Sequence, residues 1–148
     1  LFLEKNKTLA VAESCTGGLI GHRLTQTPGS SDYFLEGVVA YSNEAKNSRL
    51  EVSPTLIRKY GAVSEEVALA MADGIRKTSG ADIGLSVTGV AGPDASNNKP
   101  VGTVFIAISD KEKSDCKCFR FYSDRSRNKE RSAQAGLDLL RRWFRNLT

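Results

Sequence analysis

Residues 8–18, Thr8-Leu9-Ala10-Val11-Ala12-Glu13-Ser14-Cys15-Thr16-Gly17-Gly18, decide the fold of this chain. The apolar run at 8–14 is typical of a buried strand that ends in polar residues. A turn of small residues follows at 15–18, and residues 19–25 have the composition of a helix. Because strand, tight polar turn and helix in this order open an α/β unit, the sequence predicts an α/β fold from its first elements.

The rest of the chain continues this alternation and adds a hairpin. Further strands are expected at 34–42, 82–88, 101–109 and 115–122, and further helices at 43–50, 54–60, 65–79 and 125–147. The last two strands are close enough in sequence to pair antiparallel beside parallel neighbours. The last helix has a core face with spacings of three and four, made of Ala133, Leu137, Leu140, Phe144 and Leu147. The predicted fold is a three-layer α/β/α sandwich with a mixed, mostly parallel sheet, and residues 1–148 are expected to form one domain.

Composition limits the classes of protein that the chain can belong to. Of its 148 residues, 40% are hydrophobic and 26% are charged, and no apolar run is long enough to span a membrane. The net charge of +4 suits an anionic ligand but is too weak to indicate nucleic-acid binding. The chain begins at Leu1 without an initiator Met or a signal-like segment, so we expect a truncated helix end there.

The cysteines indicate neither a disulfide framework nor a metal site. Cys116 and Cys118 form a CxC pair with no histidine beside it, and Cys15 is distant in sequence. Zinc normally takes four ligands, so the pair alone is a weak metal signal. We therefore expect reduced thiols, a cytoplasmic location, and neither metal nor cofactor.

Polar segments follow three of the predicted strands, at 13–18, 41–43 and 86–94. In α/β sheets, ligands gather at the carboxyl ends of strands, and glycine turns let the backbone approach an anion. Neither a P-loop motif nor a dinucleotide-binding GxGxxG motif is present. Each segment alone is equally compatible with an ordinary tight turn.

A serine nucleophile in this chain would need a base other than histidine. The single histidine, His22, lies within the first predicted helix and is expected to point away from the strand ends. A lysine whose pKa is lowered by burial can serve as the base instead. Lys46 is the best-placed lysine, although an ordinary surface lysine paired with Glu44 is also compatible with the pattern.

Six ordered motifs resemble those of the CinA C-terminal domain family, from about Thr8 to Leu140. They are AESCTGG at 12–18, PGSS at 28–31, VAYSNEAK at 39–46, GAVS at 61–64, TGVAGP at 88–93 and KPVGT at 99–103. The resemblance implies an amidase that hydrolyses the carboxamide of nicotinamide mononucleotide to nicotinate mononucleotide and ammonia. It implies Ser31 as nucleophile, Lys46 as its base and Thr88 as an assisting hydroxyl.

We expect a set of substrate-binding residues at the polar strand ends, with the phosphate at the turn of residues 14–18, because free N–H groups at a helix start favour an anion. The family resemblance adds Tyr41 and Arg125 to this set. The set is Glu13, Ser14, Thr16, Gly17, Gly18, Tyr41, Gly89, Gly92 and Arg125. Two local departures from the family pattern occur, Ser123 before Asp124-Arg125 and the glycine-poor loop at 94–98.

Two other readings stay open from the sequence. A non-catalytic nucleotide-binding or regulatory module would keep the same fold. A nucleic-acid-associated protein would use the arginines of the last helix, which we interpret instead as a solvated helix face. No nucleic-acid or membrane partner is expected, but the exposed edges of the sheet favour a homo-oligomer.

Overall fold

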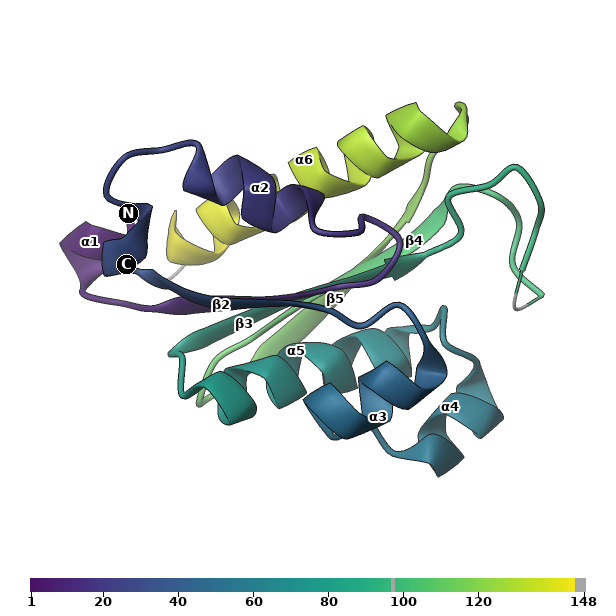
Figure 1. The fold of residues 1–148 in the computed structure, drawn as a ribbon, viewed down its shortest axis with the longest axis horizontal. Helices are drawn as coiled ribbons and strands as arrows, with labels where there is room; N and C mark the ends of the chain where they lie inside the picture. Colours follow the sequence, from purple (N-terminus) through teal and green to yellow (C-terminus); the bar gives the residue numbers. More distant parts are fainter. Residues whose placement is uncertain (97, 146–148) are drawn as a thin grey trace.

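The structure, a computed structural model, describes residues 1–96 and 98–145 and contains one five-stranded sheet in the order β2-β1-β3-β4-β5 (Figure 1). The strands are β1 (Leu9–Glu13), β2 (Phe34–Val39), β3 (Ile83–Gly89), β4 (Thr103–Ser109) and β5 (Ser114–Arg120). The helices are α1 (Phe2–Lys5), α2 (Leu19–Thr25), the 3₁₀ turn η1 (Ser30–Asp32), α3 (Asn43–Leu50), α4 (Pro54–Tyr60), α5 (Glu65–Ser79) and α6 (Arg125–Arg145).

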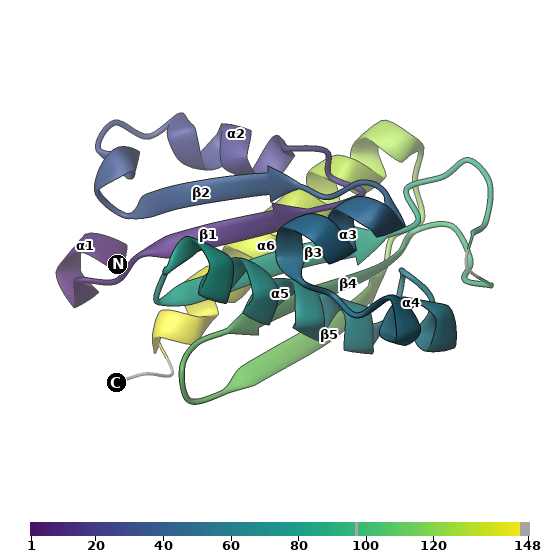
Figure 2. The ribbon, with the colours of Figure 1, turned by 60° about the horizontal axis from the view of Figure 1, so that its bottom comes forward.

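The helices form a layer on each face of the sheet. Figures 1 and 2 show α2 and α6 on one face and α3, α4 and α5 on the other. Strand β1 runs parallel to both β2 and β3, and the pairs β3–β4 and β4–β5 are antiparallel. The predicted three-layer α/β/α fold with a mixed sheet is confirmed.

Most strand boundaries differ from the sequence prediction by one to three residues. β2 ends at Val39, earlier than expected, because Ser42 is the N-cap of α3 and its Oγ accepts a hydrogen bond from the N–H of Ala45 (3.0 Å). β4 begins at Thr103. The described part of α6 ends at Arg145, and the predicted core residue Leu147 lies outside the described residues.

The core lies on both faces of β1, whose residues are all buried. Leu9 and Val11 belong to the apolar cluster under α2 and α6, whereas Ala10 and Ala12 belong to the cluster against α3 and α5. The small side chains on the second face let α5 pack closely on the sheet.

A backbone contact fixes α3 against α5. A Cβ added to Gly74 of α5 would overlap the backbone carbonyl of Leu50, the last residue of α3. Only glycine permits this approach, so α3 is held firmly at the carboxyl end of β2.

Within the described part of the chain, no helix is both long and apolar enough to cross a membrane.

Candidate active site

A pocket of about 320 Å³ opens at the carboxyl ends of β1, β2 and β3. Ser14 follows β1, Tyr41 follows β2, and Thr88 lies near the end of β3. Lys46 enters the pocket from the second turn of α3. Parallel strands bring their carboxyl ends to one edge, which explains how residues distant in sequence meet here.

Lys46 is almost fully buried, with 1% of its surface exposed. Its Nζ donates hydrogen bonds to the carbonyl oxygen of Ala40 (2.9 Å) and to Oγ of Ser14 (3.1 Å). Within the described residues Lys46 forms no ion pair with a carboxylate. The alternative that Lys46 is an ordinary surface lysine paired with Glu44 is therefore wrong. Burial lowers the pKa of Lys46 below its ordinary value, which favours the neutral amine.

Ser14 is held rigidly beside that amine. Its N–H donates to the carbonyl of Val87 on β3 (2.9 Å), which extends the sheet by one residue beyond β1. The side chain is 8% exposed and lies at the pocket wall. With Lys46 neutral, the same Oγ–Nζ contact lets the serine hydroxyl donate to the amine. This is the arrangement that activates a serine nucleophile without histidine.

Ser31 lies at the opposite end of β2 and is exposed. Ser31 belongs to η1, which precedes β2, whereas Lys46 follows β2. A strand rises about 3.3 Å per residue, so the six residues of β2 separate Ser31 from Lys46 by roughly 20 Å. The expected contact of Ser31 with Lys46 is therefore not formed within one chain. Ser14 takes that place.

Thr88 and Cys15 complete the wall around the serine. Thr88 is 1% exposed, and its Oγ1 donates to the carbonyl of Ala62 (2.8 Å), so its proton is directed away from Lys46. Burial raises the pKa of the Cys15 thiol to about 12. A thiol with that pKa is uncharged at neutral pH, which leaves Ser14 as the better nucleophile in this pocket.

Glu13 does not face the pocket, which corrects its expected role in substrate binding. Its side chain is 2% exposed, and its two carboxylate oxygens accept the N–H groups of Ile20 (2.9 Å) and Gly21 (3.1 Å) at the start of α2. These two amides lie just beyond the turn at 14–18, where the phosphate was expected, and are already occupied. Glu13 is a positioning residue that ties α2 to the end of β1.

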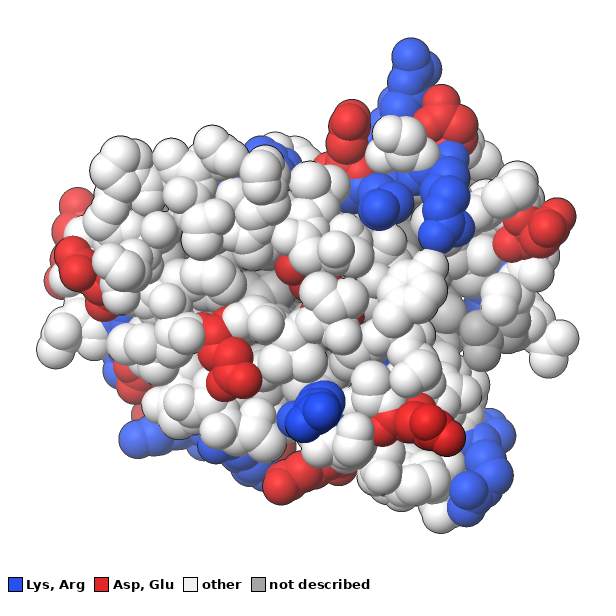
Figure 3. Space-filling view, viewed as in Figure 1, with Lys and Arg blue, Asp and Glu red and all other residues white. Residues whose placement is uncertain are grey.

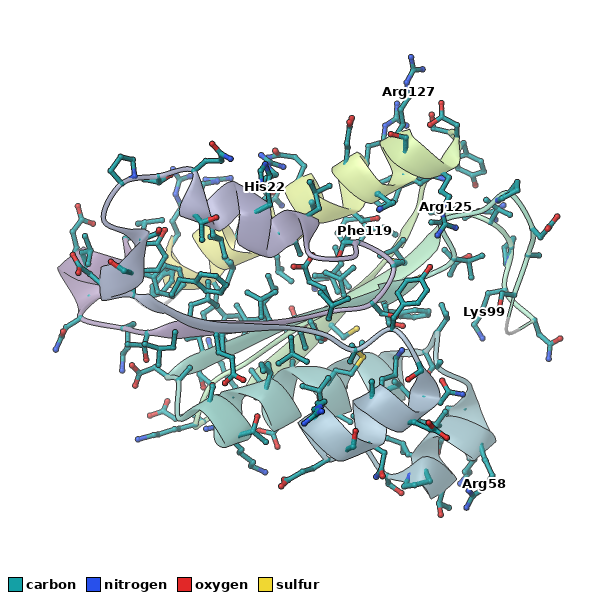
Figure 4. All side chains as sticks on the ribbon, in the orientation of Figure 1. His22, Arg58, Lys99, Phe119, Arg125 and Arg127 are labelled. Carbon is teal, nitrogen blue, oxygen red and sulfur yellow. The ribbon has the colours of Figure 1, made fainter. Side chains whose placement is uncertain are left out.

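A second, wider hollow of about 640 Å³ adjoins the pocket beside residues 16–18. Arg125 lines both, and it donates to the carbonyl of Gly92 (2.6 Å) and to the hydroxyl of Tyr41 (2.9 Å). Figure 4 shows Arg125 extending toward the sheet while Arg127 points away, and Figure 3 shows basic side chains gathered over the start of α6. Lys129, which sequence reasoning missed, also lines this hollow. Its place four residues after Arg125 puts both on one helix face.

His22 also borders the wider hollow, but its Nε2 lies 3.1 Å from the Nε2 of Gln26, one turn later on the same helix. The histidine is exposed on α2 and does not line the pocket of Ser14 and Lys46 (Figure 4). Among the residues whose placement is described, no group of three or more His, Cys, Asp or Glu side chains could hold a metal ion.

Comparison with known proteins agrees with this architecture. The model of the CinA C-terminal domain family matches residues 1–144. The chain belongs to the CinA family. A CinA-like protein of Citrifermentans bemidjiense is 52% identical over 97% of this chain and 35% of its own length, and a putative competence-damage inducible protein of Alkaliphilus metalliredigens is 50% identical over 95% and 34%. The chain thus spans about a third of the length of these curated relatives.

Solved structures of the CinA superfamily show the same fold. A superfamily protein from Escherichia coli superposes with a TM-score of 0.92 at 30% identity, covering 94% of this chain and 81% of that one. The competence/damage inducible protein CihA from Agrobacterium tumefaciens gives 0.90 at 36% identity, covering 94% and 86%.

Two glycines in this CinA domain shape the pocket through the backbone. A Cβ on Gly89 would lie 2.8 Å from the carbonyl oxygen of Thr103, and Gly92 has a φ of 104°, which disfavours any other residue. Both line the pocket without a side chain of their own. They let the end of β3 and the loop after it pack closely against residues 101–104, which leaves the pocket open on this side.

Proposed function

We propose that this CinA domain is an amidase that hydrolyses the carboxamide of nicotinamide mononucleotide, with Ser14 as nucleophile and Lys46 as general base and acid. The observation that carries the proposal is the 3.1 Å contact between Lys46 Nζ and Ser14 Oγ in a buried pocket. The choice of nicotinamide mononucleotide rests on the family resemblance of the sequence motifs, and the basic hollow supports a phosphorylated substrate.

Acylation begins with the neutral amine of Lys46. It takes the proton of the Ser14 hydroxyl as Oγ attacks the carboxamide carbon, which forms the C–O bond and places negative charge on the carbonyl oxygen. The protonated Lys46 then gives its proton to the amide nitrogen. The C–N bond breaks, ammonia leaves, and a nicotinoyl ester remains on Ser14.

Deacylation repeats these roles with water. Lys46, neutral again, takes a proton from a water molecule that attacks the ester carbon, and the proton returns to Ser14 Oγ as the ester bond breaks. The products are nicotinate mononucleotide and the free enzyme. Burial of Lys46 is essential to both steps, because an exposed lysine would be charged and unable to accept a proton near neutral pH.

The charge on the carbonyl oxygen and the phosphate need separate partners. Backbone N–H groups of Cys15 and Thr16 follow the nucleophile directly, and neither donates a hydrogen bond to another backbone carbonyl within the described residues. We assign the oxyanion to these amides. The phosphate is assigned to Arg125 and Lys129, because Glu13 occupies two amides at the start of α2.

The test compares two serine variants by ammonia release from nicotinamide mononucleotide. Ser14→Ala is expected to abolish turnover and leave folding intact, while Ser31→Ala, a matched change at an exposed serine, keeps it. If Ser31→Ala abolished turnover and Ser14→Ala kept it, Ser31 would be the nucleophile. Substrate binding without turnover in the unaltered protein would favour the non-catalytic nucleotide-binding module instead.

A further inference from the structure

A groove of about 570 Å³ lies between β5 and α6, and it shares no lining residue with the active-site pocket. Its walls are mostly apolar, with Phe119 and Phe121 on β5 and Ala135 and Leu139 on α6. The two phenylalanine rings stack in parallel, with their centroids 5.7 Å apart. Figure 4 shows Phe119 on the side of the sheet that α6 covers. The proposed hydrolysis uses none of these residues, so the groove is a separate feature of the molecule.

Strand β5 is the last strand of the sheet, and within the described residues its outer side is a free edge (Figure 2). Phe121 donates its N–H to the carbonyl of Gly102, next to β4 (2.8 Å). Because alternate residues of a strand direct their backbone groups to opposite sides, Cys118 and Arg120 direct theirs away from β4. A further strand can therefore form hydrogen bonds with both residues.

The open part of this edge coincides with the groove. Nearer the beginning of β5, the outward N–H of Cys116 donates to the carboxylate of Asp115 (2.9 Å) and is therefore occupied. Cys118, the next outward residue, lines the groove. A strand added at Cys118 and Arg120 would lie along the groove and direct every second side chain into it, opposite Phe119.

The groove has the length of a five-residue strand. The residues of α6 that line it recur every three or four positions from Arg131 to Arg142, a rise of about 16 Å. Because α6 follows β5 and returns along it (Figure 1), Arg131 lies toward the Phe121 end of the groove. Arg142 lies toward the Lys117 end. Five residues of an extended chain also span about 16 Å, so a strand of that length would pass both arginines.

Both ends of the groove favour negative charge. Arg131 is exposed and, within the described residues, takes part in no hydrogen bond or ion pair. At the other end Lys117 pairs with Asp115 (3.2 Å), a surface contact that contributes little. Asp138 is the only carboxylate among the described residues that line the groove, and Arg142 already pairs with it (2.7 Å). A ligand with a carboxylate at each end therefore complements the groove.

We propose that this groove binds an extended acidic peptide of a partner protein, which adds a strand to β5 and places one apolar side chain between Phe119 and Leu139. Carboxylates two residues before and after that side chain share its face of the strand and lie about 13 Å apart, within reach of Arg131 and Lys117. A small aromatic acid would fill the apolar centre but leave the outward backbone groups of β5 unpaired. Main-chain pairing combined with a side-chain pocket is how sheet edges recognise peptides. This site does not depend on the proposed amidase activity.

Fluorescence anisotropy with two labelled peptides of the same composition tests the proposal. TETLTET places both glutamates on the face of its leucine, whereas TTELETT places them on the opposite face. TETLTET is expected to bind at least about tenfold more tightly. Equal affinity, or no binding of TETLTET at about 1 mM, would overturn the proposal. Binding of naphthoate without binding of TETLTET would make this a site for small aromatic acids and would overturn it too.

Variants of α6 locate the peptide. Arg131→Glu reverses the charge at one end of the groove and is expected to weaken the binding of TETLTET by about tenfold or more. Arg127→Glu, at a 70% exposed arginine that does not line the groove, is the matched control and should bind normally. Ala135→Trp fills the groove and is expected to abolish peptide binding while ammonia release is unchanged.

Circular dichroism checks that each variant is folded. Normal peptide binding by folded Arg131→Glu or Ala135→Trp would contradict the proposed site. If the unaltered protein bound TETLTET but released no ammonia from nicotinamide mononucleotide, the proposed function alone would be refuted.

A disulfide to exposed Cys118 tests the pairing at the edge. The peptides TECLTET and TETLCET carry a cysteine before or after the leucine; one lies opposite Cys118 in a parallel strand and the other in an antiparallel strand. Facing Cβ atoms of paired strands lie about 4.5–5.5 Å apart, close to disulfide geometry. Oxidation is expected to link one of the two peptides to Cys118 in preference to Cys116, as located by mass spectrometry. If TETLTET binds and neither cysteine peptide cross-links, the added strand at β5 is wrong.

Discussion

Replacing Lys46 with methionine removes the amine and keeps the length and most of the volume of the side chain. In the unaltered protein the Nζ donates to Ala40 O (2.9 Å) and Ser14 Oγ (3.1 Å) while 1% of the residue is exposed. General acid–base catalysis contributes about 10²–10⁴-fold. Because one lysine serves as both base and acid in the proposed mechanism, we expect the upper end, a loss of about 10⁴-fold in kcat/KM, or about 5 kcal/mol.

Stability should change far less than activity. Each lost hydrogen bond costs about 1 kcal/mol, but the variant no longer buries an amine whose protonated form is disfavoured. The native pKa of Lys46 lies below the ordinary 10.5, so the native state binds fewer protons than the unfolded chain between those two values. The stability of the unaltered protein relative to the variant therefore rises with pH through that window and is lower at acid pH.

The assay is ammonia release from nicotinamide mononucleotide over a range of pH, with urea unfolding of each variant. The kcat/KM of the unaltered protein should rise with pH through the lowered pKa of Lys46, below pH 10.5. Lys77→Met is the matched control, because Lys77 is 60% exposed and pairs with Asp73 at the surface. A Lys46→Met variant within tenfold of normal kcat/KM would refute the lysine-base mechanism.

Three further predictions concern neighbouring residues. Glu13→Gln replaces one acceptor of the two amides at the start of α2 and should lower the free energy of unfolding by about 1–3 kcal/mol in urea; no change would contradict the positioning role. Arg125→Ala should raise the KM for nicotinamide mononucleotide about 10–100-fold. It should raise the KM for nicotinamide riboside, which lacks the phosphate, much less. An equal effect on both substrates would contradict the assignment of the phosphate to Arg125. In the native protein iodoacetamide should label exposed Cys118 and leave Cys15 unlabelled until unfolding, as read by mass spectrometry; rapid labelling of Cys15 would contradict its raised pKa of about 12.

The alternation of elements was predictable because local signals mark it. Ser64 and the acidic residues after it begin α5, Gly80 ends it, and Pro54 begins α4. These signals act over a few residues and do not depend on distant contacts. Ser42 was assigned to a strand although its side chain caps α3, because a serine after apolar residues fits either element.

The serine that contacts Lys46 was harder to predict, although strand polarity indicates it. Ser14 follows β1 and Lys46 follows β2, so parallel pairing of these strands brings both to the same edge of the sheet. Ser31 precedes β2 and therefore lies at the other edge. The role of Glu13 was beyond sequence reasoning, because only the placement of α2 shows which amides its side chain reaches.

Glu13 and Ser14 are adjacent in sequence but serve opposite helical layers, since Glu13 holds α2 and Ser14 contacts Lys46 of α3. The two helical layers therefore contribute different residues to the site. Lys46, the proposed base, belongs to the α3 layer, and Arg125 and Lys129, the proposed phosphate ligands, belong to the α6 layer. If the proposed roles hold, substitutions in the first turns of α6 should change which ligand binds and leave the pKa of Lys46 unaltered, so α6 is the helix at which to redesign specificity.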